Sequence, residues 1–138
     1  ERAEHFAGGA QVRDQSHAYR APSDLQPDQW ALDGQWTVGA ERARLDRAGG
    51  RIVYRFQGRD LHLVLGPGDG GKPVRLRLRI DGAPPGADHG ADVDAQGNGS
   101  VDSQRLYQLV RLAGGDGVHT VEIEFLDPGV AAYAFTFG

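Results

Sequence analysis

The chain has no cysteine and no methionine in its 138 residues, and its one lysine is Lys72. Without cysteine there is no disulfide, no thiolate metal ligand and no thiol nucleophile, so hydrophobic burial is the main source of stability. No apolar run is long enough to cross a bilayer, and residues 1–5 do not resemble a signal peptide. Because even the first position lacks methionine, we expect the chain to be a piece of a longer protein.

The chain also has little excess charge of one sign. The net charge is -4, and acidic and basic residues are interspersed, so the chain builds no field that would attract nucleic acid or an anionic membrane. We therefore expect no nucleic-acid partner and no direct membrane insertion. The 21 glycines are too many for a helical protein, because glycine weakens helix interiors and favours turns.

Short apolar runs separated by Gly, Asp, Pro and Asn begin at Trp30 and continue to the end of the chain. This spacing, without an amphipathic helix between the runs, predicts an all-β fold, an antiparallel β-sandwich of the jelly-roll type. Eight strands are predicted, at residues 30–38, 42–45, 51–56, 61–65, 74–80, 105–110, 120–125 and 132–137, with Tyr133 pointing inward in the last.

The first part of the chain lacks sustained periodicity. Residues 1–27 contain Gly8, Gly9 and two prolines among scattered charges, which is typical of a linker or of an arm lying on a domain. At most a helical turn is expected, near residues 2–6. We therefore divide the chain into a linker or arm at 1–27 and one β-sandwich domain at 28–138.

Two predicted strands carry charges of opposite sign on their polar faces. Arg75, Arg77 and Arg79 alternate with apolar residues in one strand, and Glu122 and Glu124 do so in another. If the two strands are neighbours, these rows pair across the sheet. Binding of an anionic polymer by the arginine row is the alternative, although such a row is more often a solvated face.

Aromatic residues are the candidates for ligand binding. Flat rings make platforms for the faces of sugars, so Trp36, Tyr107 and the neighbouring Gln108 are proposed as carbohydrate contacts. The same pattern is compatible with burial: Trp30 and Trp36 are six residues apart on a strand, and tryptophan is buried in most proteins. Both interpretations stay open for Trp36 and Tyr107.

The densest polar segment, residues 88–99, raises the question of a calcium site. Asp92, Asp94 and Gly97 fall at positions 1, 3 and 6 of an EF-hand-like loop. Ser103, however, stands at position 12, where a bidentate glutamate is needed, and no helices are predicted beside the segment. A strand running into a glycine-rich turn is the favoured interpretation, with calcium at Asp92 and Asp94 as the alternative and no other cofactor expected.

The sequence offers little for catalysis. None of the four serines lies in a nucleophile-elbow context, and residues 66–71 match no phosphate-loop pattern. A carboxylate pair for glycoside cleavage is defined by its separation in space, and nothing in the sequence singles one out. We therefore expect a binding or docking domain that is not an enzyme.

Several segments resemble a known family. They are Arg2–Phe6, Gln29–Leu32, Trp36–Val38, Asp60–Gly66, Pro85–Gly90, Gln104–Val110 and Glu124–Gly138, and in this order they are similar to the C-terminal domain of DipZ-type proteins, the bacterial cytochrome c biogenesis and thiol-disulfide exchange proteins. The resemblance implies a jelly roll like that of carbohydrate-binding modules, behind a thioredoxin-like domain of the same parent chain. It also implies a periplasmic or extracytoplasmic location in a membrane-anchored or exported protein.

In that family the redox chemistry belongs to a Cys-x-x-Cys pair of the preceding domain, and this chain has no cysteine. The leading hypothesis is a non-catalytic accessory module that binds a cell-envelope glycan. The alternative is a structural module that packs on the thioredoxin-like domain, positions its protein substrates and has no glycan site. An exposed aromatic strip would favour the first, and an apolar patch formed with the N-terminal arm would favour the second.

Overall fold

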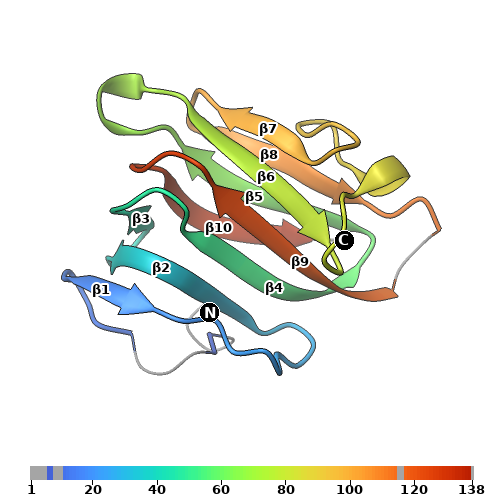
Figure 1. Ribbon diagram of the computed structural model, residues 1–138, viewed down its shortest axis with the longest axis horizontal. Coiled ribbons are helices and arrows are strands. Elements are labelled where there is room, and N and C mark those ends of the chain that lie inside the picture. Colours follow the sequence, from blue (N-terminus) through green and yellow to red (C-terminus); the bar gives the residue numbers. More distant parts are fainter. Residues whose placement is uncertain (1–5, 8–10, 115–116, 138) are drawn as a thin grey trace.

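The computed structural model describes residues 6–7, 11–114 and 117–137, with side chains as far as Tyr133. The predicted all-β class is confirmed: the described residues form ten strands, all paired antiparallel, and two short 3-10 helices (Figure 1). The elements are β1 (Ser16–Tyr19), β2 (Trp30–Val38), β3 (Ala43–Leu45), β4 (Arg51–Gly58), β5 (Asp60–Gly66), η2 (Asp69–Gly71), β6 (Val74–Ile80), η3 (Gly86–Asp88), β7 (Asn98–Val101), β8 (Arg105–Arg111), β9 (Gly117–Phe125) and β10 (Ala131–Phe137).

All eight predicted strands are present, and two were missed. β7 is short and interrupted by glycine, so its sequence looks like a turn. β1 lies in the segment predicted to be a linker or arm. The helical turn expected near residues 2–6 falls, apart from Phe6, outside the described residues. Neither described 3-10 helix is long and apolar enough to span a membrane.

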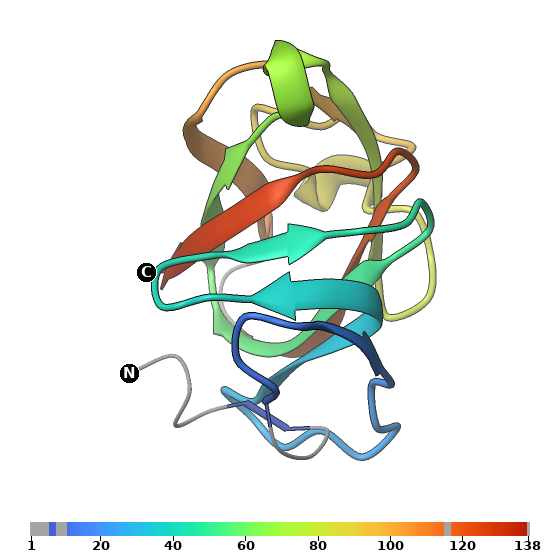
Figure 2. The same cartoon turned by 90° about the vertical axis from the view of Figure 1, so that its left-hand side faces the viewer.

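The strands form two sheets that share β2. Sheet A has the order β7-β6-β9-β4-β2, and sheet B has the order β1-β2-β3-β10-β5-β8. The first half of β2, residues 30–33, pairs with β4, and the second half, residues 34–38, pairs with β1 and β3. Figure 2 shows β2 and β3 crossing the end of the sandwich between the two sheets.

Two glycines allow β2 to pass from one sheet to the other. Gly34 has a φ of 107°, and a Cβ atom there would lie 2.8 Å from the Cα of Gly50. A Cβ atom on Gly50 would lie 2.2 Å from Leu45 Cδ1. The backbones therefore approach more closely at this corner than any side chain permits.

The core lies between the sheets and follows from the alternation of the strands. Leu76 and Leu78 of β6 and Ile123 and Phe125 of β9 are all buried on the inner face of sheet A. Trp36 from sheet B meets Phe125 edge to face, with ring centroids 6.1 Å apart. The inner faces of the two sheets thus form one continuous core.

The N-terminal segment packs onto this core. Phe6 makes edge-to-face contacts with Trp30 and Tyr19, at centroid distances of 4.8 and 6.1 Å. Residues 16–19 extend sheet B as β1, paired with β2. The described part of the segment predicted to be a linker or arm is therefore integrated into the sandwich.

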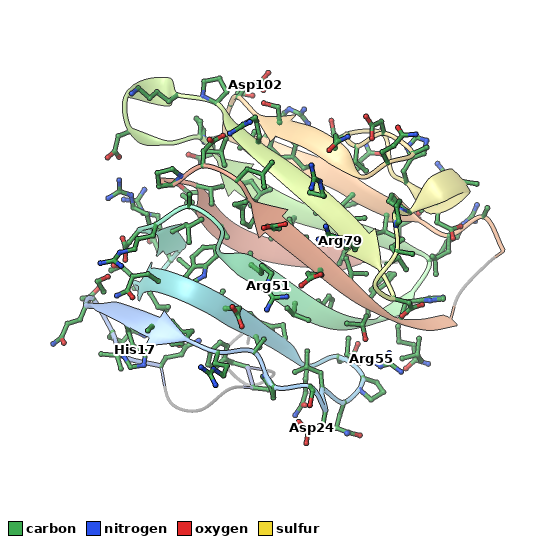
Figure 3. All side chains as sticks on the ribbon, viewed as in Figure 1. His17, Asp24, Arg51, Arg55, Arg79 and Asp102 are labelled. Carbon is green, nitrogen blue, oxygen red and sulfur yellow. The ribbon has the colours of Figure 1, made fainter. Side chains whose placement is uncertain are left out.

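The predicted pairing of the arginine and glutamate rows is confirmed on the outer face of sheet A. β6 and β9 are neighbours, with Arg79 opposite Glu122. Arg79 Nη1 lies 3.5 Å from Glu124 Oε1 and 3.9 Å from Glu122 Oε1, and Arg51 of β4 forms an ion pair with Glu122 from the other side. In Figure 3, Arg51 and Arg79 lie on this face, on either side of β9.

Candidate functional site

Trp36, the first predicted sugar contact, lies in the core. Its side chain is 0% exposed, and its indole N–H donates a hydrogen bond to the backbone carbonyl of Asp33, 3.0 Å away. Even-numbered residues of β2 point inward, and Trp36 continues that row past the corner at Gly34. The proposal of Trp36 as a glycan contact is therefore wrong, and the alternative of a core tryptophan is correct.

Tyr107, the second predicted contact, is also buried, with 1% of its surface exposed. Its hydroxyl accepts hydrogen bonds from the N–H groups of Asp102 and Ser103 and donates one to the carbonyl of Ser103, at 2.7 Å. The guanidinium of Arg105 covers the ring, 3.9 Å from its centroid. Tyr107 therefore holds the β7–β8 turn and presents no face to a ligand, which corrects the prediction.

Gln108 is exposed, as a ligand contact must be, on the outer face of sheet B opposite His62. The two aromatic residues predicted to accompany it lie on the other side of the sheet. The structure thus does not bring Trp36, Tyr107 and Gln108 together into one site.

The carboxylates proposed for calcium have other partners. Asp92 accepts hydrogen bonds from Arg105 Nη2 at 2.9 Å and from the Gln108 N–H at 2.7 Å. Burial acts to raise the pKa of Asp92, but these hydrogen bonds outweigh it, and the pKa lies below its ordinary value. Asp94 Oδ1 accepts the N–H groups of Gln96 and Asn98.

Asp94 therefore closes its own turn, as aspartate commonly does in loops. Among the described residues, no group of three His, Asp or Glu side chains is placed to hold a metal ion. The structure thus gives the two carboxylates separate partners, an arginine for Asp92 and backbone for Asp94, and does not join them into one site.

A candidate ligand-binding site lies on a different part of sheet B. A hollow of about 300 Å³ opens between β3, the β5–β6 loop and the start of β10. We call it the Tyr133 hollow, and the side chains that line it include Arg42, Arg44, Asp69, Gln104 and Tyr133. Figure 2 looks toward this side of the molecule, where the η2 loop, β10 and β3 lie next to one another.

A β-bulge places Tyr133 in this hollow. Ala132 is paired with Leu65 and Ala134 with Val64, so Tyr133 is an extra residue in β10. Bulges of this kind redirect a side chain out of the strand's alternation. Gly66, which pairs with Ala131, lies beside the ring: a Cβ atom there would be in ordinary van der Waals contact, 3.5 Å from Cε1 of Tyr133.

Polar groups border the half-buried ring of Tyr133. Its hydroxyl lies 3.2 Å from Gln104 Oε1, to which it donates, and 3.4 Å from Arg42 Nη1, from which it accepts. The side chains of Arg44 and Asp69 form an ion pair that also lines the hollow. An aromatic ring surrounded by an amide, guanidinium groups and a carboxylate can hold a small polar ring by stacking and hydrogen bonds.

A second hollow, of about 330 Å³, lies on the other side of the Arg44–Asp69 ion pair. We call it the Lys72 hollow, and Asp46 and Gly129 also line it. Both hollows share Arg44, Gly68, Asp69 and Gly129. They therefore form two adjoining parts of one groove, with the ion pair between them.

A larger hollow, of about 580 Å³, lies over sheet A beside residues 21–25. Its cations are already bound: Arg51 pairs with Asp33 and Glu122, and Arg55 donates a hydrogen bond to the hydroxyl of Thr120, 2.8 Å away. Because Arg51 and Glu122 pair with each other and Asp33 also binds Arg51, the charged groups at the centre of the larger hollow already have partners within the protein.

Sequence reasoning missed the Tyr133 hollow because it predicted that Tyr133 points inward. Strict alternation cannot reveal a bulge. The one signal for it is the unequal length of the pairing segments in β5 and β10, which becomes visible only when their register is known.

The comparisons with known proteins identify the family. The whole chain, residues 1–138, matches the family described as Thioredoxin like C-terminal domain. The chain belongs to this family. No curated protein sequence matches it.

Two solved structures share the fold of this thioredoxin-like C-terminal domain. A family two carbohydrate esterase from Cellvibrio japonicus aligns with a TM-score of 0.57 and 15% identity, over 77% of this chain and 29% of that one. A family two carbohydrate esterase from Clostridium thermocellum in complex with cellohexaose aligns with a TM-score of 0.51 and 17% identity, over 71% of this chain and 27% of that one. This chain thus matches less than a third of each esterase, and the likeness concerns the fold alone.

Proposed function

We propose that this domain is a non-catalytic accessory module of an exported, DipZ-type thiol-disulfide exchange protein, and that it binds carbohydrate in the Tyr133 hollow. The observation that carries the proposal is the half-buried Tyr133 ring, redirected by a bulge and bordered by Arg42 and Gln104. Nothing in the core requires that ring, because the aromatic core positions are filled by residues such as Trp36 and Phe125.

The chemistry of the hollow suits a sugar. A pyranose has an apolar C–H face, which an aromatic ring covers, and a rim of hydroxyls, which amides and guanidinium groups hydrogen-bond. The carbohydrate esterase solved in complex with cellohexaose shares this fold over 27% of its chain, and this supports the choice of ligand class. A solvated hollow of about 300 Å³ has room for a sugar unit with its chain continuing on either side.

Membership in the thioredoxin-like C-terminal family supports the rest of the proposal. The neighbouring partner is a thioredoxin-like domain of the same parent chain, in the periplasm or at the outer face of the membrane. That domain supplies the cysteine chemistry, and the module described here anchors it to a cell-envelope glycan.

The test is a glycan array with the purified domain, followed by calorimetric titration of each hit. Tyr133→Ala is expected to abolish binding because it removes the stacking ring, whereas Tyr133→Phe loses a hydrogen bond and weakens binding roughly 5-fold. Leu106→Ala, an exposed change elsewhere on sheet B, is the matched control and is expected to bind as the unchanged domain does. Binding that survives Tyr133→Ala would place the site elsewhere.

A second function is favoured by one observation. Leu106 is 39% exposed, the one exposed large hydrophobic side chain among the described residues, and it pairs across sheet B with Val64. This apolar spot would suit a docking module that packs on the thioredoxin-like domain and positions its substrates. Leu106→Asp would then weaken binding of the isolated thioredoxin-like domain in titration, while leaving glycan binding intact.

A further inference from the structure

The groove on sheet B is cationic although the chain as a whole is acidic. Arg42, Arg44 and Lys72 line its two hollows, together with the carboxylates of Asp46 and Asp69. Asp46 is committed elsewhere: its Oδ2 accepts hydrogen bonds from the hydroxyls of Ser16 at 2.8 Å and Thr37 at 2.7 Å. Asp69 is therefore the one lining carboxylate that meets a cation of the groove.

Asp69 is weakly held. Its side chain is 84% exposed, and it contacts Arg44 through a single oxygen. It is the first residue of the short η2 turn, whose other two residues are Gly70 and Gly71. Exposed ion pairs of this kind contribute about 0–1 kcal/mol. A ligand can therefore displace Asp69 from Arg44 at little cost.

A second loop aspartate, Asp127, forms an ion pair that is held by more hydrogen bonds. Asp127 accepts three hydrogen bonds from Arg75, from the backbone N–H, from Nε and from Nη2, at 2.9, 3.0 and 2.9 Å. The Arg44–Asp69 pair has one contact where the Arg75–Asp127 pair has three. Most of the hydrogen-bonding capacity of the Arg44 guanidinium is thus open to a second carboxylate.

We infer that the groove is specific for acidic sugars: a uronate carboxylate of the glycan replaces Asp69 on Arg44, while the sugar ring stacks on Tyr133. This inference rests on the proposed carbohydrate binding and specifies its ligand class. In the free protein Asp69 occupies the anion position, so the groove is partly neutralised until an acidic glycan arrives. Arg42 and Lys72, on the two sides of Arg44, attract neighbouring uronate units of the same chain.

The experiment compares two hexasaccharides by isothermal titration calorimetry of the whole domain: hexagalacturonate, which is acidic, and cellohexaose, which is neutral. Asp69→Asn removes the competing carboxylate and is expected to raise the affinity for hexagalacturonate roughly 2- to 5-fold. Arg44→Gln is expected to lower it at least about 10-fold. Asp24→Asn, at an exposed aspartate far from the groove, makes the same change in net charge and is the matched control.

The outcomes separate this inference from the proposed function. Tighter binding of hexagalacturonate by the Asp69→Asn variant, with cellohexaose and the Asp24→Asn variant unchanged, supports the inference. Equal affinity for both sugars, or an equal gain for both in the Asp69→Asn variant, overturns it but leaves carbohydrate binding intact. If neither sugar, nor any glycan on the array, binds the unchanged domain or Asp69→Asn, the proposed function falls as well. Circular dichroism of each variant verifies the fold.

Discussion

On the outer face of sheet A, arginine and glutamate side chains from neighbouring strands form ion pairs with one another, whereas the polar side chains of the groove on sheet B have fewer partners within the protein. Glu122 alone serves two arginines, Arg51 and Arg79. In the Tyr133 hollow, by contrast, Arg42 has a single long contact, of 3.4 Å, with a neutral hydroxyl. The glutamate of the first face is paired within the protein, and the second face retains hydrogen-bonding capacity for another molecule.

The difference arises from the regularity of the strands. β6 and β9 pair without a register shift, so rows of opposite charge meet residue by residue. The pairing of β5 with β10 contains a bulge, which places Tyr133 outside the alternation and beside Gly66. An irregularity in pairing thus creates a site on a face that would otherwise be a second solvated sheet.

The sharpest contrast is between a ring in the core and the ring in the hollow. Trp36→Ala is expected to lower the free energy of unfolding by about 3–5 kcal/mol, because a fully buried ring leaves a cavity. Tyr133→Ala is expected to lower it by less than about 1 kcal/mol, since the half-buried ring lies at the surface and outside the core. Urea denaturation followed by fluorescence and circular dichroism measures both. A loss above 3 kcal/mol for Tyr133→Ala would make that ring a structural element.

The two outer faces should also differ in what their charges do for stability. Glu122→Gln is expected to lower the free energy of unfolding by about 1 kcal/mol, because the half-buried carboxylate binds two arginines. Asp69→Asn, which breaks an exposed pair on sheet B, is expected to change it by less than about 0.5 kcal/mol. Equal losses in urea denaturation would contradict the idea that only the sheet A network is structural.

A smaller effect is expected in acid, at the loop beside β6. The side-chain and backbone hydrogen bonds from Arg75 lower the pKa of Asp127 from 3.8 to about 2. The ionised carboxylate therefore stabilises the fold fully above pH 3.8, and this contribution disappears as the pH falls to about 2. Asp127→Asn should reduce the fall in the urea midpoint between pH 4 and pH 2. Asp24→Asn controls for net charge, and an identical fall in the Asp127→Asn variant would contradict the assignment.

The alternation of apolar residues was sufficient to predict most of the fold. The strand at 74–80 has the predicted bounds because its leucines and arginines alternate without interruption. β7 could not be predicted, since its Asn98 and Gly99 are turn residues and its partner β6 supplies the order. β1 lacks an apolar row and is held by β2 and by the ring contacts of Phe6 and Tyr19.

The candidate site was much harder to predict than the fold. Residue type alone favoured Trp36 and Tyr107, but strand parity directs both into the core, and their polar atoms are bonded to backbone. The Tyr133 hollow combines residues from β3, β5, β10 and four loops that are far apart in sequence. The hollow forms only because β10 pairs with both β3 and β5, and no local sequence pattern predicts that pairing.

That pairing order has a consequence for how the domain folds. β9 lies between β4 and β6, and β10 lies between β3 and β5, so the last two strands are interior strands of their sheets. Neither sheet is continuous until these strands have joined it. Residues far apart in the sequence must therefore meet, as Ile52 of β4 and Ile123 of β9 do. Such long-range closure is slow, so we expect millisecond-to-second folding in one cooperative step. In a ribosome-bound chain that ends before β9, each sheet would be divided into two parts with open edges, which are vulnerable to aggregation.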